Sequence, residues 1–437
     1  MLIRRATLLD GDVVDIRVDS RIAEVAPALE PVDGEQVLDA GLGLVIPGLH
    51  DHHGHVHSAA AAADSLRVGV GEVHDRDDLA QVLADAEVGD DGWIRAIGYH
   101  EAVAGSLDRD GLDALAPSVP VRIQHRSGVL WTLNSAGLAA VGLADHPDGR
   151  LRSADRSWSD ALKRRDTAVD VLSRRLSRYG VTGITDATPD LDITDMVLLA
   201  EVHRRGGLRQ HVHHLAPGKR ILHDEDLDLG ELTAWIGRRH DEDAPVALHC
   251  VTAAQLVVSL AALGDAGVHP GDRIEHAAVV PDDQLDVLAG LGVTVVTQPN
   301  FVAERGDQYL ADVPAAEHQD LWRLASLLEA GVPVALSTDM PFGDGNPWAA
   351  LRAAVHRVTP SGAVLGARER IDARTALTLF LGDAAEPTRA RTVAPGAPGD
   401  LCVLAAPPED VLCDLDAKWV AATIIDGQVV GRDERRD

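Results

Sequence analysis

The sequence predicts an α/β protein, a (β/α)8 TIM barrel with a small β-sandwich domain built from both chain ends. Short β-rich runs alternate with helical stretches through the middle of the chain, as expected of parallel βα units. Eight such runs occur, which favours a barrel over an open sheet. Both ends of the chain show instead short alternating strands broken by turns.

The β-sandwich is expected to draw its strands from two distant segments. At the N-terminal end the strands are residues 2–9, 13–18 and 21–25, separated by Asp10-Gly11-Asp12 and by Asp19-Ser20. At the C-terminal end they are residues 401–404, 421–425 and 428–430, the last two flanking Asp426-Gly427. We therefore assign residues 1–46 and 394–437 to the β-sandwich and residues 47–393 to the barrel.

The barrel strands and helices follow in regular alternation. The predicted strands are residues 44–50, 181–186, 209–214, 220–223, 246–250, 273–276, 293–298 and 332–337. The predicted helices are residues 160–179, 195–205, 229–239, 253–266, 282–291 and 320–330. Residues 58–158 are too long for one crossover connection, so they are interpreted as an insertion after the first strand.

Composition excludes several classes of protein. The 437 residues carry 69 acidic and 40 basic side chains, a formal charge of −29 that repels nucleic acids and anionic membranes. No apolar run approaches the roughly 20 residues of a membrane-spanning helix. The N-terminal residues turn polar too early for a secretory signal, and three cysteines are too few for a disulfide framework. We expect a cytoplasmic protein.

A run of histidines follows the first predicted barrel strand. In Leu49-His-Asp-His-His-Gly-His-Val-His, residues Asp51, His53, His55 and His57 are spaced by two, which in a strand places them on one face. Converging imidazoles are a metal-ligand arrangement. An H-x-H pair alone is weak evidence, because 20 histidines in 437 residues give such pairs by chance.

Three further candidates, His249, His276 and Asp339, each end a predicted strand, where catalytic residues of such barrels lie. Each alone is equally well explained as a hydrogen-bonded histidine or a helix-capping aspartate. Together, four imidazoles and a carboxylate at one end of a barrel form a costly polar cluster unless something binds them. The sequence therefore predicts a metal site.

Lys219 starts the predicted fourth strand and would face the same end of the barrel. Only three lysines occur in the chain, at positions 163, 219 and 418, and every other basic residue is arginine. A solvated surface position is therefore a weaker explanation for Lys219 than it is for most lysines. A buried lysine loses its proton readily, and its amine can take up carbon dioxide to form a carbamate that bridges two cations.

These residues resemble the amidohydrolase superfamily of metal-dependent hydrolases, most closely the branch that contains N-substituted formamide deformylases. The matching segments span the chain in the family's order: Pro47-Gly-Leu-His-Asp-His-His-Gly-His, Gly180-Val-Thr-Gly-Ile-Thr-Asp-Ala-Thr, His249-Cys-Val-Thr, Arg273-Ile-Glu-His-Ala, Thr297-Gln-Pro-Asn-Phe and Leu336-Ser-Thr-Asp-Met-Pro. Arg126-Ser-Gly and Leu133-Asn-Ser match the branch's insertion.

The resemblance implies a binuclear centre of two divalent metal ions. His53 and His55 would bind the more buried ion, His249 and His276 the second, and a carbamate on Lys219 would bridge them. Asp339 would touch the first ion and its water, and His57 would lie outside the set. These ligands suit Zn²⁺, although iron, manganese or cobalt can occupy such sites. The short interval between the third and fourth strands makes Lys219 the least secure assignment.

The implied reaction is hydrolysis of a non-peptide C–N bond, in an amide, formamide or cyclic imide, by a metal-activated hydroxide. Asp339 would act as the catalytic residue, taking a proton from the attacking hydroxide and delivering it to the leaving nitrogen. Loops above the barrel would contact a small-molecule substrate. The candidates are His100, Glu101, Arg126, Gln298 and Asn300, although loop salt bridges or turn contacts explain them equally well.

Two other functions remain open from the sequence. A hydrolytic deaminase would use the same fold, but such enzymes usually carry a glutamate three residues after the fifth-strand histidine, where this chain has Thr252. A catalytically inactive scaffold would keep the barrel and lose metal ligands, whereas every predicted ligand is present. A Ser-His-Asp hydrolase is disfavoured because no G-x-S-x-G occurs. The substrate, and whether the protein forms a homodimer, are not encoded in any motif.

Overall fold

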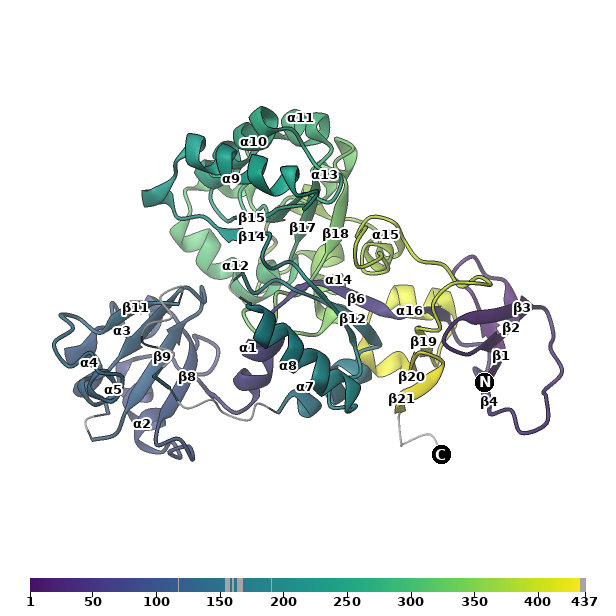
Figure 1. The fold of residues 1–437 in the computed structure, drawn as a ribbon, viewed down its shortest axis with the longest axis horizontal. Helices are drawn as coiled ribbons and strands as arrows, with labels where there is room; N and C mark the ends of the chain where they lie inside the picture. Colours follow the sequence, from purple (N-terminus) through teal and green to yellow (C-terminus); the bar gives the residue numbers. More distant parts are fainter. Residues whose placement is uncertain (117, 154–157, 159–160, 163–167, 190, 433–437) are drawn as a thin grey trace. The chain divides into compact units, whose positions relative to one another are not determined.

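A computed structural model describes residues 1–116, 118–153, 158, 161–162, 168–189 and 191–432 (Figure 1). The chain divides into two compact units. Unit 1 comprises residues 1–56 and 170–437, and unit 2 comprises residues 57–169. Residues 58–158, predicted as an insertion after the first barrel strand, lie within unit 2.

The two chain ends of unit 1 build two four-stranded sheets that share one apolar core. The first has the order β3-β2-β1-β4 and the second β21-β20-β19-β5. Strand β5 joins the second sheet because Ile46 lies opposite Cys402 in an antiparallel ladder. Ile3, Ile16, Val403 and Ile424 are among the buried residues of the core. The bounds are β1 Leu2–Thr7, β2 Val13–Val18, β3 Ile22–Ala26, β4 Val37–Asp39, β5 Val45–Pro47, β19 Leu401–Leu404, β20 Val420–Ile425 and β21 Gln428–Arg432.

Eight parallel strands lie at or near the eight predicted barrel positions. The first is displaced, because predicted residues 44–50 include β5 of the terminal sheet and the barrel strand begins only at Leu49. The eight strands form two sheets, β13-β12-β6 and β14-β15-β16-β17-β18, and a parallel bridge between Gly54 and Met340 joins the two at one edge. Their bounds are β6 Leu49–Gly54, β12 Val181–Asp186, β13 His211–His214, β14 Lys219–Ile221, β15 Ala247–Cys250, β16 Arg273–His276, β17 Thr294–Thr297 and β18 Val334–Leu336.

The predicted closed barrel is only partly realised as a hydrogen-bonded structure. Within the described residues, no ladder joins β13 to β14. The connection between them turns sharply, because the amide of Gly218 donates to the carbonyl of Leu215, and Pro217 has no N–H to donate. The interval that separates β13 from β14 in the sequence is therefore used for a turn and not for a longer ladder.

Helices follow the strands as predicted, and α9, α10, α11 and α13 lie beside strands β14–β18 (Figure 1). Thr252 and Gln255 form a capping box that starts α10 at the predicted residue. The helix predicted for residues 160–179 is described only as α7, and residues 160 and 163–167 lie outside the described chain. The helix predicted for residues 320–330 is shorter, because Leu321 forms a bridge with Val279. The helices of unit 1 are α7 Val169–Arg178, α8 Ile193–Arg204, α9 Leu229–Asp241, α10 Ala253–Ala266, α11 Asp282–Leu291, α12 Asn300–Asp312, α13 Ala325–Glu329, α14 Pro347–His356, α15 Ala373–Thr378 and α16 Pro408–Cys413.

Unit 2 is built on a five-stranded mixed sheet of order β11-β10-β9-β8-β7. Its strands are β7 Leu66–Arg67, β8 Ile94–Tyr99, β9 Val121–His125, β10 Leu130–Leu133 and β11 Arg150–Arg152, and its helices are α1 Val56–Ala63, α2 Arg76–Ala84, α3 Glu101–Ala104, α4 Arg109–Asp113 and α5 Ser135–Ala140. Leu79, Ile94 and Ile123 belong to one buried cluster, and Trp93 and Trp131 belong to another. In the described chain, no helix combines the length and apolarity needed to cross a membrane.

Strand β13 is tied to the C-terminal sheet by an ion pair. The Nε2 atom of His211 lies 3.3 Å from a carboxylate oxygen of Asp400 and 3.8 Å from one of Asp426. The hydrogen bond to Asp400 raises the pKa of His211, although burial and the charge of Arg391 oppose the shift. The imidazolium form of His211 therefore stabilises this contact between β13 and the C-terminal segment.

The first prediction concerns Gly180, which joins α7 to β12. Its φ is +78° and a Cβ atom there would lie 2.4 Å from Sγ of Cys402. The backbone strain and the clash together should make Gly180→Ala less stable by roughly 2–4 kcal/mol, read as a lower thermal midpoint. Gly237→Ala is the control, because Gly237 lies inside α9 with nothing within 4 Å of its Cβ position. An unchanged midpoint in Gly180→Ala would contradict this account.

The second prediction concerns pH. Because the folded-state pKa of His211 is raised, its contribution is complete below the unfolded pKa and is lost as the pH rises through the folded pKa. The thermal midpoint of wild type should be higher than that of His211→Gln, and the difference should be larger at about pH 5.5 than at about pH 8.5. A difference that is equal at both values, or larger at the higher pH, would show that the charge of His211 does not stabilise the fold.

Candidate metal centre

Strand β6 and the residue that follows it carry the first two predicted ligands, His53 and His55. All six residues of β6 are buried, and His53 has no exposed surface. The strand ends at Gly54, so the spacing by two that places Asp51 and His53 on one face does not extend to His57, which lies on helix α1. His55 follows the strand directly, and its side chain remains 13% exposed.

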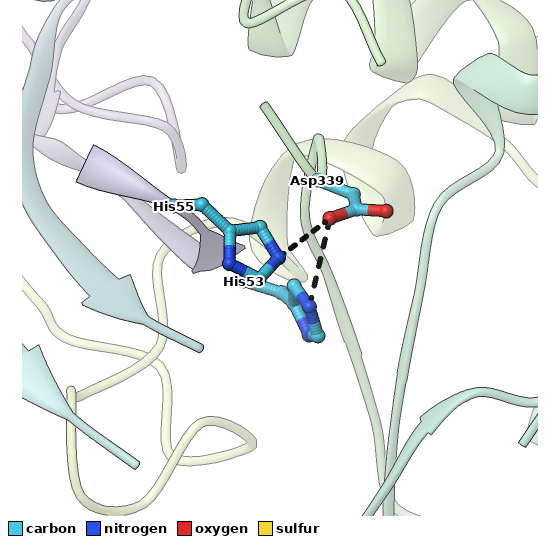
Figure 2. A group of neighbouring side chains, drawn as sticks. All are labelled: His53, His55 and Asp339. Carbon is cyan, nitrogen blue, oxygen red and sulfur yellow. Dashed lines mark ion pairs between the residues drawn. The ribbon is translucent and has the colours of Figure 1, made fainter. Parts of the chain in front are cut away.

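Asp339 lies opposite these two histidines, just after strand β18 (Figure 2). Its Oδ1 atom is 3.3 Å from Nε2 of His55 and 3.6 Å from Nε2 of His53. The residue adopts a φ of +56°, and its amide donates to the carbonyl of His53. Oδ1 is buried and accepts no hydrogen bond from the described residues. Such an unpaired atom costs about 1–3 kcal/mol or more, so this arrangement is favourable only with a ligand.

Asp51 holds the loop that carries Asp339. Its carboxylate accepts hydrogen bonds from the amide of Thr338 at 3.0 Å and from the Thr338 hydroxyl. The amide of His55 also donates to the carbonyl of Met340 at 2.8 Å. These bonds connect the end of β6 to the end of β18. Asp51 therefore fixes the loop that carries Asp339 against the strand that carries His53.

Lys219, the least secure prediction, begins strand β14 and points into the same cluster. It is 5% exposed, and its Nζ atom lies 3.4 Å from Nε2 of His53. Burial lowers the pKa of Lys219 to about 8, so its amine loses a proton more readily than that of an exposed lysine. The neighbouring Arg220 faces away, toward Glu231 and the ring of Trp235. Lys219 is therefore buried beside a predicted metal ligand.

His249 and His276 reach the cluster from neighbouring strands by different means. In the ladder between β15 and β16, His249 lies opposite Glu275, whereas His276 lies opposite Cys250. Strand alternation alone would therefore point the His276 side chain away from His249. The φ of His276 is +71°, which redirects its ring to 4.5 Å from that of His249 and 4.7 Å from that of His53, between ring centroids.

Three of the four predicted histidine ligands have a hydrogen-bond partner at Nδ1. His53 contacts Glu275, His55 lies 3.1 Å from the hydroxyl of Thr188, and His276 lies 2.8 Å from Oε1 of Gln298. An acceptor at Nδ1 places the ring hydrogen there and leaves the Nε2 lone pair for a metal. Burial also lowers the pKa of His53 and His276 well below the usual value and that of His249 to about 3, so these imidazoles are neutral.

The donor set therefore fits a divalent metal ion. His53, His55 and Asp339 offer ligand atoms that all lie within 4.8 Å of one another. Their free atoms are imidazole nitrogens and a carboxylate oxygen, which are ordinary zinc ligands. Sequence reasoning missed the orienting residues Glu275 and Thr188. The sequence signal for Glu275 was its place within the quoted Arg-Ile-Glu-His motif, whereas its position opposite His249 is visible only in the structure.

Two of the predicted substrate-binding residues have structural partners in unit 1. Gln298 is fully buried and bridges His276 to the hydroxyl of Ser337. Asn300 is 1% exposed, and its Nδ2 donates to the carbonyl of Thr338 and to Glu304. Both residues thus support metal-ligand segments. The Asn300 Oδ1 atom remains buried and accepts no hydrogen bond within the described chain.

The other predicted substrate-binding residues gather within unit 2. Oε2 of Glu101 lies 3.2 Å from Nε2 of His125 and 3.9 Å from Nε2 of His100, and the amide of Arg126 donates to the carbonyl of Tyr99. The Nδ1 atoms of His100 and His125 accept from the amides of Ala102 and Ser127. Their hydrogens must then be on Nε2, which favours hydrogen bonds to Glu101 over metal binding.

Cys250 follows His249 and packs on the opposite face of β15, as strand alternation predicts. Its Sγ atom lies 3.2 Å from the hydroxyl of Ser259 on α10, and burial raises its pKa to about 12. A thiol so reluctant to ionise is a poor nucleophile. The prediction of a buried packing thiol is confirmed.

Comparisons with known proteins identify the family of the chain. The model of the amidohydrolase family matches residues 36–431. An N-substituted formamide deformylase of Arthrobacter pascens is 25% identical over 444 residues, covering 82% of this chain and 81% of that protein.

Two solved structures share the fold. An uncharacterized metal-dependent hydrolase from Pyrococcus horikoshii has a TM-score of 0.72 at 18% identity, covering 93% of this chain and 97% of that one. Its counterpart from Pyrococcus furiosus has a TM-score of 0.69 at 18% identity, with 93% and 99% covered. The chain belongs to the amidohydrolase family, whose members are hydrolases that act on carbon–nitrogen bonds other than peptide bonds.

Proposed function

We propose that this protein is a metal-dependent amidohydrolase that cleaves the C–N bond of an N-substituted formamide or a related amide or cyclic imide. The observation that carries the proposal is the buried Oδ1 of Asp339, which accepts no hydrogen bond from the described residues and faces the Nε2 atoms of His53 and His55. The similarity to a formamide deformylase over most of both chains supports formamides as the first substrate class.

Two divalent ions, with zinc the best-suited cation, would be held by His53, His55, His249, His276, Asp339 and a carbamate on Lys219. The burial of Lys219 beside His53 supports its assignment. Burying a lysine side chain away from water is costly unless a neighbouring group compensates for it. The chain has only two other lysines. When bound, such ions lower the pKa of water and polarise a carbonyl oxygen.

Different residues of the chain then have different roles in hydrolysis. Asp339 accepts a proton from the water that attacks the carbonyl carbon, and it delivers this proton to the nitrogen as the C–N bond breaks. A formamide would thus give formate and an amine. Asp51 and the Thr338 amide hold Asp339 in place during both transfers. Glu275, Thr188 and Gln298 keep the histidine rings oriented.

The deaminase alternative is less well supported. A deaminase glutamate would be expected three residues after His249, where Thr252 instead accepts from the Gln255 amide and starts α10. A catalytically inactive scaffold is disfavoured because all six predicted ligands are buried or nearly buried in one unit. Contacts of His100, Glu101 and Arg126 with substrate, and direct contact by Gln298 and Asn300, stay predictions.

We further propose that the eight parallel strands act as one (β/α)8 barrel spanning residues 47–393, with a β-sandwich from residues 1–46 and 394–437. The bridge between Gly54 and Met340 and the shared core of the two terminal sheets support this architecture. A cytoplasmic location is supported by the three cysteines, which are free thiols.

The third prediction is metal content. Wild type purified with bicarbonate and without chelator should contain about two equivalents of divalent metal by elemental analysis, whereas Lys219→Ala should lose one or both. Lys418→Ala is the matched control, because that lysine is exposed and pairs with Asp414. One equivalent in both wild type and Lys219→Ala would remove Lys219 from the site. No metal in wild type would favour a scaffold.

The fourth prediction is the effect of Asp339→Asn on turnover. Asparagine keeps the size of the side chain but cannot take up and release the proton, so kcat should fall roughly 10²–10⁴-fold. Hydrolysis should be measured as amine release from N-substituted formamides, N-acyl amines and cyclic imides. Asp286→Asn, an exposed substitution on α11, should leave kcat unchanged. Equal turnover in wild type and Asp339→Asn would refute a proton-transfer role.

A further inference from the structure

Glu275 is the acidic residue that contacts His53 from behind the predicted metal centre. It lies on β16 opposite His249 and has no exposed surface. Its Oε2 atom contacts Nδ1 of His53. A carboxylate can only accept a hydrogen bond, so Nδ1 must carry the hydrogen and Nε2 must present its lone pair to Asp339 and Lys219.

A second residue holds the Glu275 carboxylate. Nε of Arg273 lies 2.7 Å from Oε1 of Glu275, and NH2 lies 3.2 Å from Oε2. The same NH2 donates to the carbonyl of His52 at 2.6 Å. Strands β16 and β6 belong to different sheets, so this contact fixes the carboxylate relative to the strand that carries His53.

Glu275 differs from the other Nδ1 partners in charge. Thr188 and Gln298 offer neutral oxygens to His55 and His276. A carboxylate makes a stronger hydrogen bond and increases the basicity of the imidazole that donates to it. Its negative charge also favours cations at the Nε2 side of the ring. Of these three histidines, His53 is therefore the one whose affinity for a metal ion depends most on a neighbouring residue.

We propose that Glu275, held by Arg273, is the positioning residue that makes His53 the dominant ligand of the more buried metal ion. This inference rests on the proposed metal-dependent function. Glu275 sets the tautomer and orientation of His53, and the loss of its charge weakens metal binding without removing any ligand.

The test is metal affinity of the full-length protein, measured by chelator competition with Zn²⁺ and by the absorption spectrum of the Co²⁺-loaded protein. Glu275→Gln should bind the tighter equivalent roughly 10–100-fold more weakly, with an altered Co²⁺ spectrum, and Glu275→Ala more weakly still. Glu369→Gln is the control, because Glu369 is also buried and pairs with an arginine, Arg323, but contacts no predicted ligand.

A merely structural role of Glu275 would lower the stability of Glu275→Gln, as expected of Glu369→Gln, and leave metal affinity unchanged. If Glu275→Gln does not fold, Glu275→Asp keeps the charge and withdraws the carboxylate by one methylene, and a smaller loss of affinity is expected. Unchanged affinity and spectrum in the folded variant would overturn the inference while leaving the proposed function intact. Absence of metal in wild type would instead overturn the proposed function.

Discussion

The rest of the centre depends on one constraint: His53 is buried, so each of its ring nitrogens needs a polar partner. A dry imidazole needs a partner at each nitrogen, and in this fold Glu275 meets Nδ1 while Lys219 and Asp339 face Nε2. Each of these groups is itself buried and needs its own partner. Arg273 forms an ion pair with Glu275. Within the described residues, Asp339 Oδ1 accepts no hydrogen bond although it faces the two histidines, and a bound cation would satisfy it.

Backbone geometry does as much as side-chain chemistry to assemble this centre. Parallel strands bring their carboxyl ends to one edge, but strict alternation would send every second side chain away from it. Positive φ angles at His276 and Asp339 overcome that limit at two strand ends. Both residues lack the conformational freedom of glycine, so each positive φ costs about 1–3 kcal/mol. Surrounding hydrogen bonds offset this cost, such as the one that the Thr338 amide donates to Asp51.

The predicted metal ligands and several of the predicted substrate contacts lie in different parts of the chain. The predicted ligands all lie within unit 1, on β6 or directly after it, on β14, β15 and β16, and in the loop after β18. His100, Glu101 and Arg126 lie within unit 2, where Glu101 is hydrogen-bonded to His125. Loops vary more readily than strand ends, so members of one family can keep a common centre while substrates differ.

The sequence by itself predicted the alternation of strands and helices, the β-strands at both chain ends and the histidines and aspartate that the structure brings together, because residue spacing and strand-end positions are local properties of the chain. It also identified Cys250 as a packing thiol by simple alternation. Only the tertiary structure decided that His276 turns back into the site, that Gln298 supports a ligand, and that Glu275 stands behind His53. Those features depend on contacts between strands far apart in sequence and on φ angles that no local pattern specifies.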